Sequence, residues 1–353
     1  MNINLSEKQY GFNDIWIKPA VISNIEHRAE CNPYIEDKIL PLFTAPMNSV
    51  INEENYKIFQ ENGINTIIPR GVDYNIRYKL STKTFIAVGL DEFIKFIDQY
   101  KEELYSCDDS DDLIRYVCVD IANGHMKKLI DLCAKAKSIF TYHLVIMTGN
   151  IANSLTYLEY AKAGIDYVRC QIGSGSMCIT SCNVSIHTGI VTLLKEIIEQ
   201  RNNVQADIEY CQESHFCSQY KSVPYVIADG GFNNFSKIIK ALALGVDYVM
   251  IGQIFAQTEE ACGEIKIDDG FRYREYYGMS TKRAQAETGK TELRTSEGIE
   301  KRVKVLYTLS GWCDNFKSYL QSAMSYTNSR NLIEFANSEL CLVSNSEFKD
   351  FYK

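Results

Sequence analysis

The sequence predicts one α/β domain, a (β/α)₈ barrel with eight parallel strands and a flap after the eighth, and three observations lead to this fold class. Short, continuously apolar segments recur eight times, as expected for parallel strands that are covered on both faces. Between them lie segments with helical spacing that end in a glycine, which suits a helix C-cap. Eight strand–helix repeats favour a closed barrel, although a doubly wound open sheet would produce the same alternation.

Eight segments have the strand pattern. In chain order they are LPLFTAPM (40–47), NTIIPR (65–70), TFIAVG (84–89), YVCVDIA (116–122), LVIMTGN (144–150), YVRCQI (167–172), YVIADGG (225–231) and YVMIGQI (248–254). The helical segments 153–164 and 233–245 lead into the sixth and the eighth strand. Each ends in a glycine that is followed by a hydrophobic residue and an aspartate, so we expect two equivalent helix-to-strand joints.

Two segments depart from this rhythm. Residues 202–222 are polar and precede the seventh strand, so we expect a surface insertion there. Residues 255–310 follow the eighth strand, and a long excursion after a barrel strand lies over the active-site face. Their most polar part, 280–293, is therefore predicted to be a mobile flap within a single domain that spans residues 1–353.

The composition excludes several classes of protein. A net charge of −8 over 353 residues disfavours a nucleic-acid-binding protein, which needs a surplus of Lys and Arg on one face. No apolar run approaches the roughly 20 residues of a membrane span, and the N-terminus lacks a signal-peptide pattern, so we expect a cytoplasmic protein without membrane contact. A small anionic ligand is compatible with the charge, because backbone amides alone can bind it.

Twelve cysteines are scattered through strand-like segments rather than clustered in loops, so we interpret most of them as reduced core residues. Cys118 and Cys170, inside two predicted strands, are examples. The chain has no CxxC pair, and its nearest approach is Cys178 with Cys182, which makes a zinc site only a minor alternative.

Small and polar residues gather where the predicted strands end, and barrel enzymes place their sites at these carboxyl ends. Gly230, Gly231, Gly252 and Ser176 suit a phosphate, because backbone amides without side-chain bulk can converge on its oxygens. Asp229 could accept hydrogen bonds from a ribose diol. Each glycine alone is compatible with a plain turn, whereas together they favour a nucleoside monophosphate.

Cys178 lies in the loop after the sixth strand, on the same rim. Converging loop amides can favour a thiolate, which is the nucleophilic form of cysteine. Thr180 could relay a proton if a stronger acid or base supports it. From these residues alone, a buried bystander such as Cys118 is an equal alternative for Cys178.

Several motifs resemble the IMP dehydrogenase/GMP reductase family in their order and spacing. They are PMNSV (46–50), DIANG (120–124), GSGSMCIT (173–180), ADGG (228–231), YYGMS (276–280) and RTSEG (294–298), and the resemblance runs from about residue 12 to residue 326. It implies a (β/α)₈ barrel, usually a homotetramer, that binds a purine nucleotide through its 5′-phosphate. It also implies that Cys178 attacks C2 of the purine and forms a covalent thioimidate.

The resemblance also assigns ligand contacts. Those to the substrate, GMP or IMP, are Ser176, Asp229, Gly230, Gly231, Gly252, Gln253, Gly278, Met279, Ser280, Arg294, Ser296 and Gly298. Those to a nicotinamide cofactor are His27, Arg28, Arg70, Asp120, Ile121, Ala122, Ile172, Gly173, Ser322, Ala323, Met324 and Ser325, of which His27, Arg28 and 322–325 would reach the cofactor of a neighbouring subunit. A monovalent cation such as K⁺ would bind at Gly173, Gly175, Cys178 and Ser181.

Four features favour the reductase branch of the family. Only residues 90–115 separate the third and fourth strands, so the regulatory domains that dehydrogenases insert there are missing. The 280–293 flap has no Arg-Tyr pair, which dehydrogenases use to activate water. DIANG stands where dehydrogenases tend to have Ser-Ser-Gln-Gly, and Glu297 stands where they have glutamine.

Reductases of this family convert GMP to IMP and ammonia with NADPH. A pair formed by Thr180 and Glu297 would supply the proton for the departing ammonia, which a glutamine cannot do. Ser181 and Ile299 depart from the basic residues usual in reductases. Two alternatives stay open: a dehydrogenase without regulatory domains that oxidises IMP to XMP with NAD, and a purine-nucleotide-binding protein without catalytic activity.

Overall fold

The computed structural model describes residues 8–106, 113–175, 180–287 and 298–343. Its centre is one eight-stranded parallel sheet, ordered β2-β9-β8-β7-β6-β5-β4-β3. The strands are β2 (Leu42–Thr44), β3 (Ile67–Ile68), β4 (Phe85–Val88), β5 (Arg115–Asp120), β6 (Leu144–Ile151), β7 (Tyr167–Cys170), β8 (Tyr225–Asp229) and β9 (Tyr248–Ile251). Every segment with the predicted strand pattern overlaps one of them.

The two ends of this sheet meet, so the sheet closes into a barrel rather than an open doubly wound sheet. Phe43 in β2 forms a parallel bridge with Asn65, just before β3. The backbone N–H of Thr44 donates to the Asn65 carbonyl at 2.9 Å, and the N–H of Asn65 donates to the Leu42 carbonyl at 3.0 Å. The (β/α)₈ fold class is therefore confirmed.

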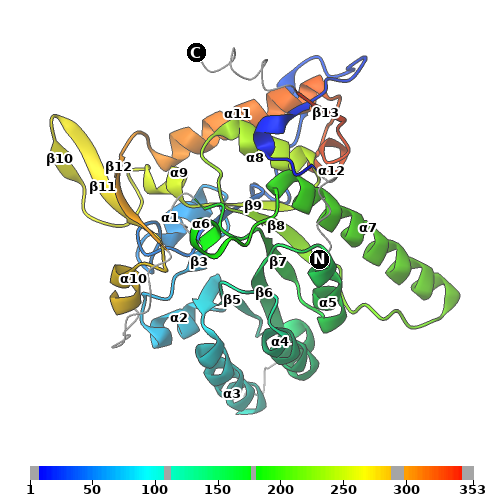
Figure 1. Ribbon diagram of the computed structural model, residues 1–353, viewed down its shortest axis with the longest axis vertical. Helices are drawn as coiled ribbons and strands as arrows, with labels where there is room; N and C mark the ends of the chain where they lie inside the picture. Colours follow the sequence, from blue (N-terminus) through cyan, green and yellow to red (C-terminus); the bar gives the residue numbers. More distant parts are fainter. Residues whose placement is uncertain (1–7, 107–112, 176–179, 288–297, 344–353) are drawn as a thin grey trace.

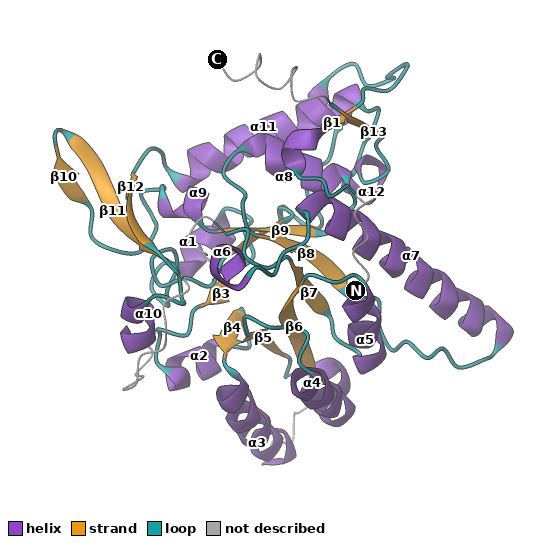
Figure 2. Cartoon of the chain, viewed as in Figure 1, coloured by secondary structure: helices purple, strands orange, loops and turns teal. Residues whose placement is uncertain are grey.

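Most helices surround the strands on the outside, whereas α6 (Thr180–Val184) lies over the centre of the ring of strands in this view (Figures 1 and 2). The helices between and after the strands are α1 (Tyr56–Glu61), α2 (Tyr74–Leu80), α3 (Leu90–Ser106), α4 (Lys127–Phe140), α5 (Leu155–Ala163), α6, α7 (Ile190–Ser214), α8 (Phe235–Ala243), α9 (Gln253–Ala256) and α11 (Leu309–Tyr326). Inside the barrel, aromatic rings fill the space: the Phe43 ring centroid lies 5.0 Å from that of Tyr248, and that of Phe85 lies 5.4 Å from that of Tyr167. The interior is a packed core and not a pore.

The two predicted helix-to-strand joints are equivalent in the structure. Gly164 and Gly245 both have positive φ, +80° and +100°, which lets the chain turn after α5 and α8. The carboxylate of Asp166 accepts a 2.7 Å hydrogen bond from the Ile146 N–H of the neighbouring strand, and Asp247 accepts one of 2.7 Å from Val226 in the same way. Each aspartate thus fixes the start of its strand.

Most of the predicted surface insertion, residues 202–222, is helical. Residues 202–214 are the second half of α7, which runs outward from the barrel (Figure 1), and His215 ends the helix with a φ of 59°. The helix continues because Val204 is buried and Ile208 packs against the core, which keeps one apolar face along it. Only the return to β8 is irregular.

The segment after β9 builds a second, antiparallel sheet beside the barrel. It contains β10 (Lys266–Asp268), β11 (Phe271–Tyr277) and β12 (Glu300–Lys304), with α10 (Lys282–Glu287) between the last two. The buried Arg274 guanidinium fastens β11 to the chain after α9, because it donates to the carbonyls of Ala256 and Thr258 at 3.1 and 2.6 Å. The predicted flap, 280–293, contains α10, and its residues 288–293 lie outside the described part.

Outside the barrel and the antiparallel sheet, a strand near the N-terminus pairs with a strand near the C-terminus. β1 (Ile15–Ile17) and β13 (Leu340–Leu342) form an antiparallel pair beside α8, and α12 (Leu332–Phe335) precedes β13. In the part of the chain that the structure describes, no helix combines the length and apolarity needed to cross a bilayer.

Candidate active site at the carboxyl ends of the barrel strands

The turn after β8 and the loop after β7 are in direct contact. Gly230 and Gly231 have φ of +108° and +80°, a conformation that side chains other than glycine rarely adopt. A Cβ placed on Gly230 would lie 2.6 Å from Ser174 Oγ and 3.0 Å from the Gly175 nitrogen. Glycine at this position therefore allows the two loops to approach each other at one corner of the barrel rim.

This corner carries polar groups that suit an anion. Ser174 Oγ is buried and makes no hydrogen bond within the described part of the chain. Lys237, in the first turn of α8, donates from Nζ to the Gly231 carbonyl at 3.3 Å and so brings a positive charge to the turn. A hydroxyl, backbone amides and an ammonium group together can neutralise and hydrogen-bond a phosphate.

Asp229 ends β8 and is held by two side chains from inside the barrel. Arg169 of β7 donates to Asp229 Oδ2 from Nε and Nη2 at 3.0 and 2.8 Å, and Asn150 Nδ2 donates to the same oxygen at 2.7 Å. Within the described residues, all these hydrogen bonds end on Oδ2, which leaves Oδ1 as the acceptor for a ligand. The predicted ribose contact is compatible with this arrangement.

Arg169 and Asn150 are site residues that our sequence analysis did not assign. Arg169 also donates from Nη1 to Asp120 Oδ1 at 2.5 Å and is only 7% exposed. Burial alone would lower the pKa of the Arg169 guanidinium, but the carboxylates of Asp229 and Asp120 outweigh it and raise this pKa well above its ordinary value. A charged residue within an otherwise apolar strand pattern, YVRC, was the signal that could have identified it.

The end of β9 meets the antiparallel sheet on the same rim. A Cβ on Gly252 would lie 2.7 Å from Tyr276 Oη, so β11 covers this turn closely. Gln253, the next residue, accepts a 3.0 Å hydrogen bond through Oε1 from Lys301 Nζ of β12. Lys301, which our sequence analysis did not assign, therefore brings a cation to the rim, and burial lowers the pKa of this ammonium group.

The segment 278–280 lies close to Gly298, which is also predicted to contact the substrate. A Cβ on Gly298 would lie 2.9 Å from Ser280 Oγ and 3.0 Å from Thr281 Cγ2. Gly278 is fixed as well, since its carbonyl accepts hydrogen bonds from the backbone N–H and the hydroxyl of Thr281 at 3.1 and 2.8 Å. The structure thus brings this segment and Gly298 together.

The remaining predicted residues of the reaction centre belong to two segments, 173–180 and 294–298. Ser176, Cys178, Arg294, Ser296 and Glu297 lie outside the described residues. Thr180 begins α6, and its side chain is likewise not described.

The base of the predicted cysteine loop is described. Ser181 Oγ lies 3.1 Å from the Ile172 carbonyl oxygen and 3.0 Å from that of Ile186. Gly173 has a φ of +75°, and a Cβ on it would lie only 1.7 Å from Ser181 Oγ. The two ends of the loop therefore touch, which suits a ring of backbone carbonyls around a monovalent cation. A cation at Gly173, Gly175, Cys178 and Ser181 stays a prediction.

The expected cofactor contacts divide between two places. Near the strand ends, Ile121 is half-buried, Ala122 is exposed and Ile172 is buried, while Asp120 is paired with Arg169. Arg70 donates from Nε to Glu92 Oε2 at 3.2 Å and keeps 26% of its side chain exposed. The apolar side chains suit a nicotinamide ring, and the partly exposed guanidinium suits a phosphate.

The second place is on the outer surface, beside α11. His27 and Arg28 are exposed, and the loop that leads to them is fixed to α11 by a 2.7 Å hydrogen bond from Ser23 Oγ to the Ser325 carbonyl. Of the predicted residues 322–325, Met324 is fully buried in the core, so its side chain does not face a ligand. The other three are partly exposed.

One further contact ties α10 to the barrel. Glu287, the last residue of α10, accepts hydrogen bonds from Asn48 Nδ2 at 2.6 Å and from Tyr277 Oη at 3.0 Å. Asn48 lies in the PMNSV motif after β2, so the described end of the flap is attached to the rim of the barrel.

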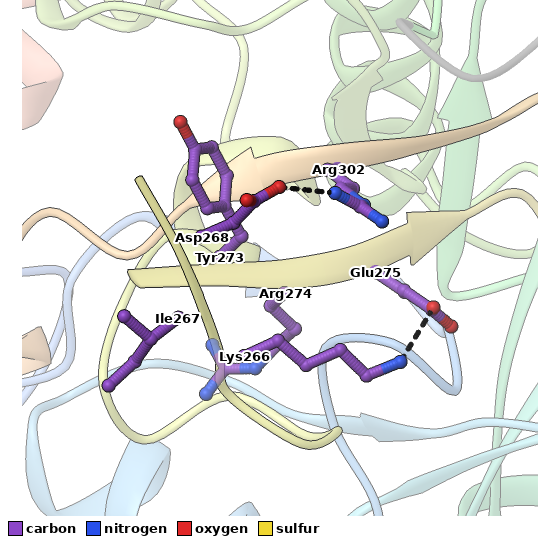
Figure 3. A pocket seen from close by; sticks show the side chains of 7 residues that line it. All are labelled: Lys266, Ile267, Asp268, Tyr273, Arg274, Glu275 and Arg302. Carbon is purple, nitrogen blue, oxygen red and sulfur yellow. Dashed lines mark hydrogen bonds and ion pairs between the residues drawn. The ribbon is translucent and has the colours of Figure 1, made fainter. Parts of the chain in front are cut away.

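The pocket on the antiparallel sheet contains none of the predicted site residues. It is lined by Lys266, Ile267, Asp268, Tyr273, Arg274, Glu275 and Arg302 (Figure 3). Two ion pairs lie in it, Lys266 with Glu275 at 3.1 Å and Arg302 with Asp268 at 2.9 Å. Arg274, the third cation of the lining, donates to the carbonyls of Ala256 and Thr258.

The two cysteines inside the barrel strands are core residues, as predicted. Cys118 and Cys170 are fully buried, and burial raises the pKa of the Cys118 thiol to about 12 and that of Cys170 far above its ordinary value. The ten described cysteines are free thiols, but Cys182, Cys217 and Cys341 are exposed rather than part of the core.

Comparison with known proteins gives the same family as the motifs. The family model of the IMP dehydrogenase / GMP reductase domain matches residues 108–350. The GMP reductase of Pediococcus pentosaceus is 29% identical over 97% of this chain and 98% of its own length. Those of Helicobacter pylori and Bacillus subtilis are 27% and 28% identical, over 98% and 97% of this chain and 98% of their own lengths.

Proposed function

The chain belongs to the IMP dehydrogenase / GMP reductase family, and from this premise we propose that it is a GMP reductase, an oxidoreductase that converts GMP to IMP and ammonia with NADPH. The observation that carries the proposal is the similarity to proteins named GMP reductase over nearly the whole chain. The short connection between β4 and β5, residues 89–114, leaves no room for an inserted domain and supports the same assignment.

The chain's own residues would bind GMP at the corner formed by the β7 and β8 loops. The amides of Gly230 and Gly231, with Ser174 Oγ and Lys237, would hold the 5′-phosphate. Asp229 Oδ1 would accept hydrogen bonds from the ribose hydroxyls. Gln253 and the segment 278–280 lie on the adjoining part of the rim and would bind the rest of the nucleotide.

The chemistry would proceed through Cys178. Its thiolate adds to C2 of the guanine, and the exocyclic amino group leaves as ammonia with a proton from the Thr180–Glu297 pair. When bound, NADPH supplies the hydride that replaces sulfur at C2. The balance is GMP, NADPH and one proton giving IMP, NADP⁺ and ammonia, with Cys178 regenerated.

The cofactor would lie against residues from two copies of the chain. Arg70, Asp120–Ala122 and Ile172–Gly173 would contact it from one subunit. His27, Arg28, Ser322, Ala323 and Ser325 would contact it from a neighbour, in a cytoplasmic homotetramer. A monovalent cation such as K⁺, bound by carbonyls of the cysteine loop, would hold that loop in its active shape.

A screen of substrate and cofactor pairs tests the proposal. The purified protein is incubated with GMP and NADPH, with IMP and NAD, and with each compound alone. We expect GMP-dependent loss of the reduced nicotinamide absorbance and formation of IMP. NADH formation from IMP and NAD at a higher rate would identify a dehydrogenase instead. GMP binding without turnover, unchanged in Cys178→Ala, would identify a non-catalytic nucleotide-binding protein.

A further inference from the structure

A single buried arginine connects two sides of the barrel rim. Arg169 lies on β7, and its guanidinium reaches Asp229 on the neighbouring β8 and Asp120 on β5, two strands away in the other direction. Nη1 also lies 3.6 Å from Cys118 Sγ, below Asp120 on the same strand. Figure 1 shows these strands side by side in the barrel wall. The arginine is therefore an internal bridge across four adjacent strands.

A glycine on the strand between β5 and β7 leaves room for this bridge. Gly149 on β6, between β5 and β7, has a φ of +146°. A Cβ on Gly149 would lie 2.4 Å from the Arg169 carbonyl oxygen and 2.9 Å from Arg169 Cβ. Any other residue at 149 would displace the strand that carries the arginine, so the glycine and the bridge depend on each other.

Arg169 supplies the positive charge that stabilises two partly buried carboxylates, those of Asp120 and Asp229. The side chains of Asp120 and Asp229 are only 21% and 14% exposed, and that of Arg169 is 9% exposed. A partly buried carboxylate without a partner is costly, and two of them would also repel each other. The fork of the guanidinium can pair with both at once, whereas the single ammonium group of a lysine cannot keep this geometry.

The bridge also fixes which oxygen of Asp229 is available. Oδ2 receives three hydrogen bonds, two from Arg169 and one from Asn150, whose Nδ2 also donates to the Gln171 carbonyl at 2.9 Å. With Oδ2 saturated, the carboxylate cannot rotate without losing these bonds. Oδ1 is thereby presented in one orientation beside the Gly230–Gly231 turn.

We propose that Arg169 is a positioning residue for substrate recognition: it orients Asp229 toward the ribose diol of the nucleotide and couples that side of the site to Asp120 on the cofactor side. This inference rests on the proposed function, because it takes the ligand of Asp229 to be a nucleoside monophosphate. Arg169 itself does not touch the reacting atoms.

The test measures how well the protein distinguishes GMP from 2′,3′-dideoxy-GMP, which lacks the diol. Calorimetric binding without cofactor gives the ratio of the two dissociation constants. For the unaltered protein we expect a ratio of about tenfold or more, the value of one or two charge-assisted hydrogen bonds. In Arg169→Lys we expect the GMP affinity to fall about tenfold and the ratio to drop to within about threefold.

A matched control separates positioning from general destabilisation. Arg115→Lys changes another arginine of the barrel, 4% exposed and paired with Glu103 at 2.6 Å, which lies at the opposite, amino end of β5. We expect it to lower stability while the ratio stays as in the unaltered protein. A merely structural role of Arg169 would move both dissociation constants equally and leave the ratio unchanged, and that result would overturn the inference.

A second variant covers the case in which Arg169→Lys does not fold. Asp120→Asn keeps the volume and removes the charge that anchors Nη1, so the ratio should again fall; an unchanged ratio contradicts the inference. The failures are distinguishable. If the unaltered protein neither binds nor converts GMP, the proposed function fails, whereas normal turnover with an unaffected ratio in the variants refutes only the role of Arg169.

Discussion

Substitution of Gly230 by alanine tests the nucleotide-binding corner most specifically, because the chain contains a matched glycine elsewhere. Gly230 has a φ of +108° and faces the β7 loop, with a Cβ position 2.6 Å from Ser174 Oγ. Gly270, in the turn between β10 and β11, has a φ of +76°, and its Cβ would meet nothing within 4 Å. Both variants place an alanine at positive φ, and only Gly230→Ala adds a collision with a neighbouring loop.

The expected magnitudes follow from this difference. An alanine at positive φ costs about 1–2 kcal/mol, so both variants should lose roughly this much free energy of unfolding. In Gly230→Ala the new methyl group must also push the Ser174–Gly175 loop away by about 1 Å to restore ordinary contact distances of about 3.5–4.0 Å. A displacement of this size in a binding site is expected to weaken GMP binding by about 10–100-fold.

Two measurements check this prediction. Urea unfolding gives the stability of each variant, and calorimetry gives its affinity for GMP and for guanosine, which lacks the phosphate. Gly230→Ala should lose the affinity difference between GMP and guanosine, while Gly270→Ala should retain it. Equal GMP affinities in the two variants would refute the assignment of this corner to the phosphate.

Three further outcomes are expected. Cys178→Ala should abolish turnover and leave GMP binding within about threefold of the parent, as measured by calorimetry; retained turnover would exclude Cys178 as the nucleophile. Glu287→Gln should raise the KM for GMP about threefold to tenfold, because one of the two accepting oxygens becomes an NH2 donor and the charge that pairs with Arg283 is lost; an unaltered KM would show that this attachment of α10 does not affect GMP binding. Burial lowers the pKa of Lys240 to about 8. Above that pH the folded chain has lost a proton that the unfolded chain still binds, so the stability of the parent should rise relative to Lys240→Met between pH 8 and about 10, and parallel urea-unfolding profiles would contradict this.

The barrel was predictable because its signals are local. Eight apolar segments with helical segments between them determine the strand order, and Asp166 and Asp247 repeat one joint at two places in the chain. The second half of α7 was missed because its polar composition hid an apolar face that only Val204 and Ile208 maintain. An apolar face with so few residues can be recognised only from the structure, which shows what these residues pack against.

The candidate site was predictable to the extent that its residues stand at strand ends. Glycine turns such as Gly230–Gly231 can be recognised in the sequence from their composition and spacing. The YVRC pattern marks Arg169 as unusual, but it does not reveal its role. The roles of Arg169 and Lys301 depend on partners 49 to 60 positions away in sequence for Arg169 and 48 for Lys301. Only the closed barrel brings these partners within hydrogen-bonding distance.

The most direct test of the central claim follows the hydrogen that arrives at C2 of the purine. The protein is incubated with GMP and NADPH that carries deuterium at the transferable position of the nicotinamide, and the products are analysed by mass spectrometry. The proposed reductive deamination predicts IMP with one deuterium at C2 and one equivalent of ammonia for each NADPH oxidised. Unlabelled IMP, or NADPH oxidation without ammonia, would contradict it.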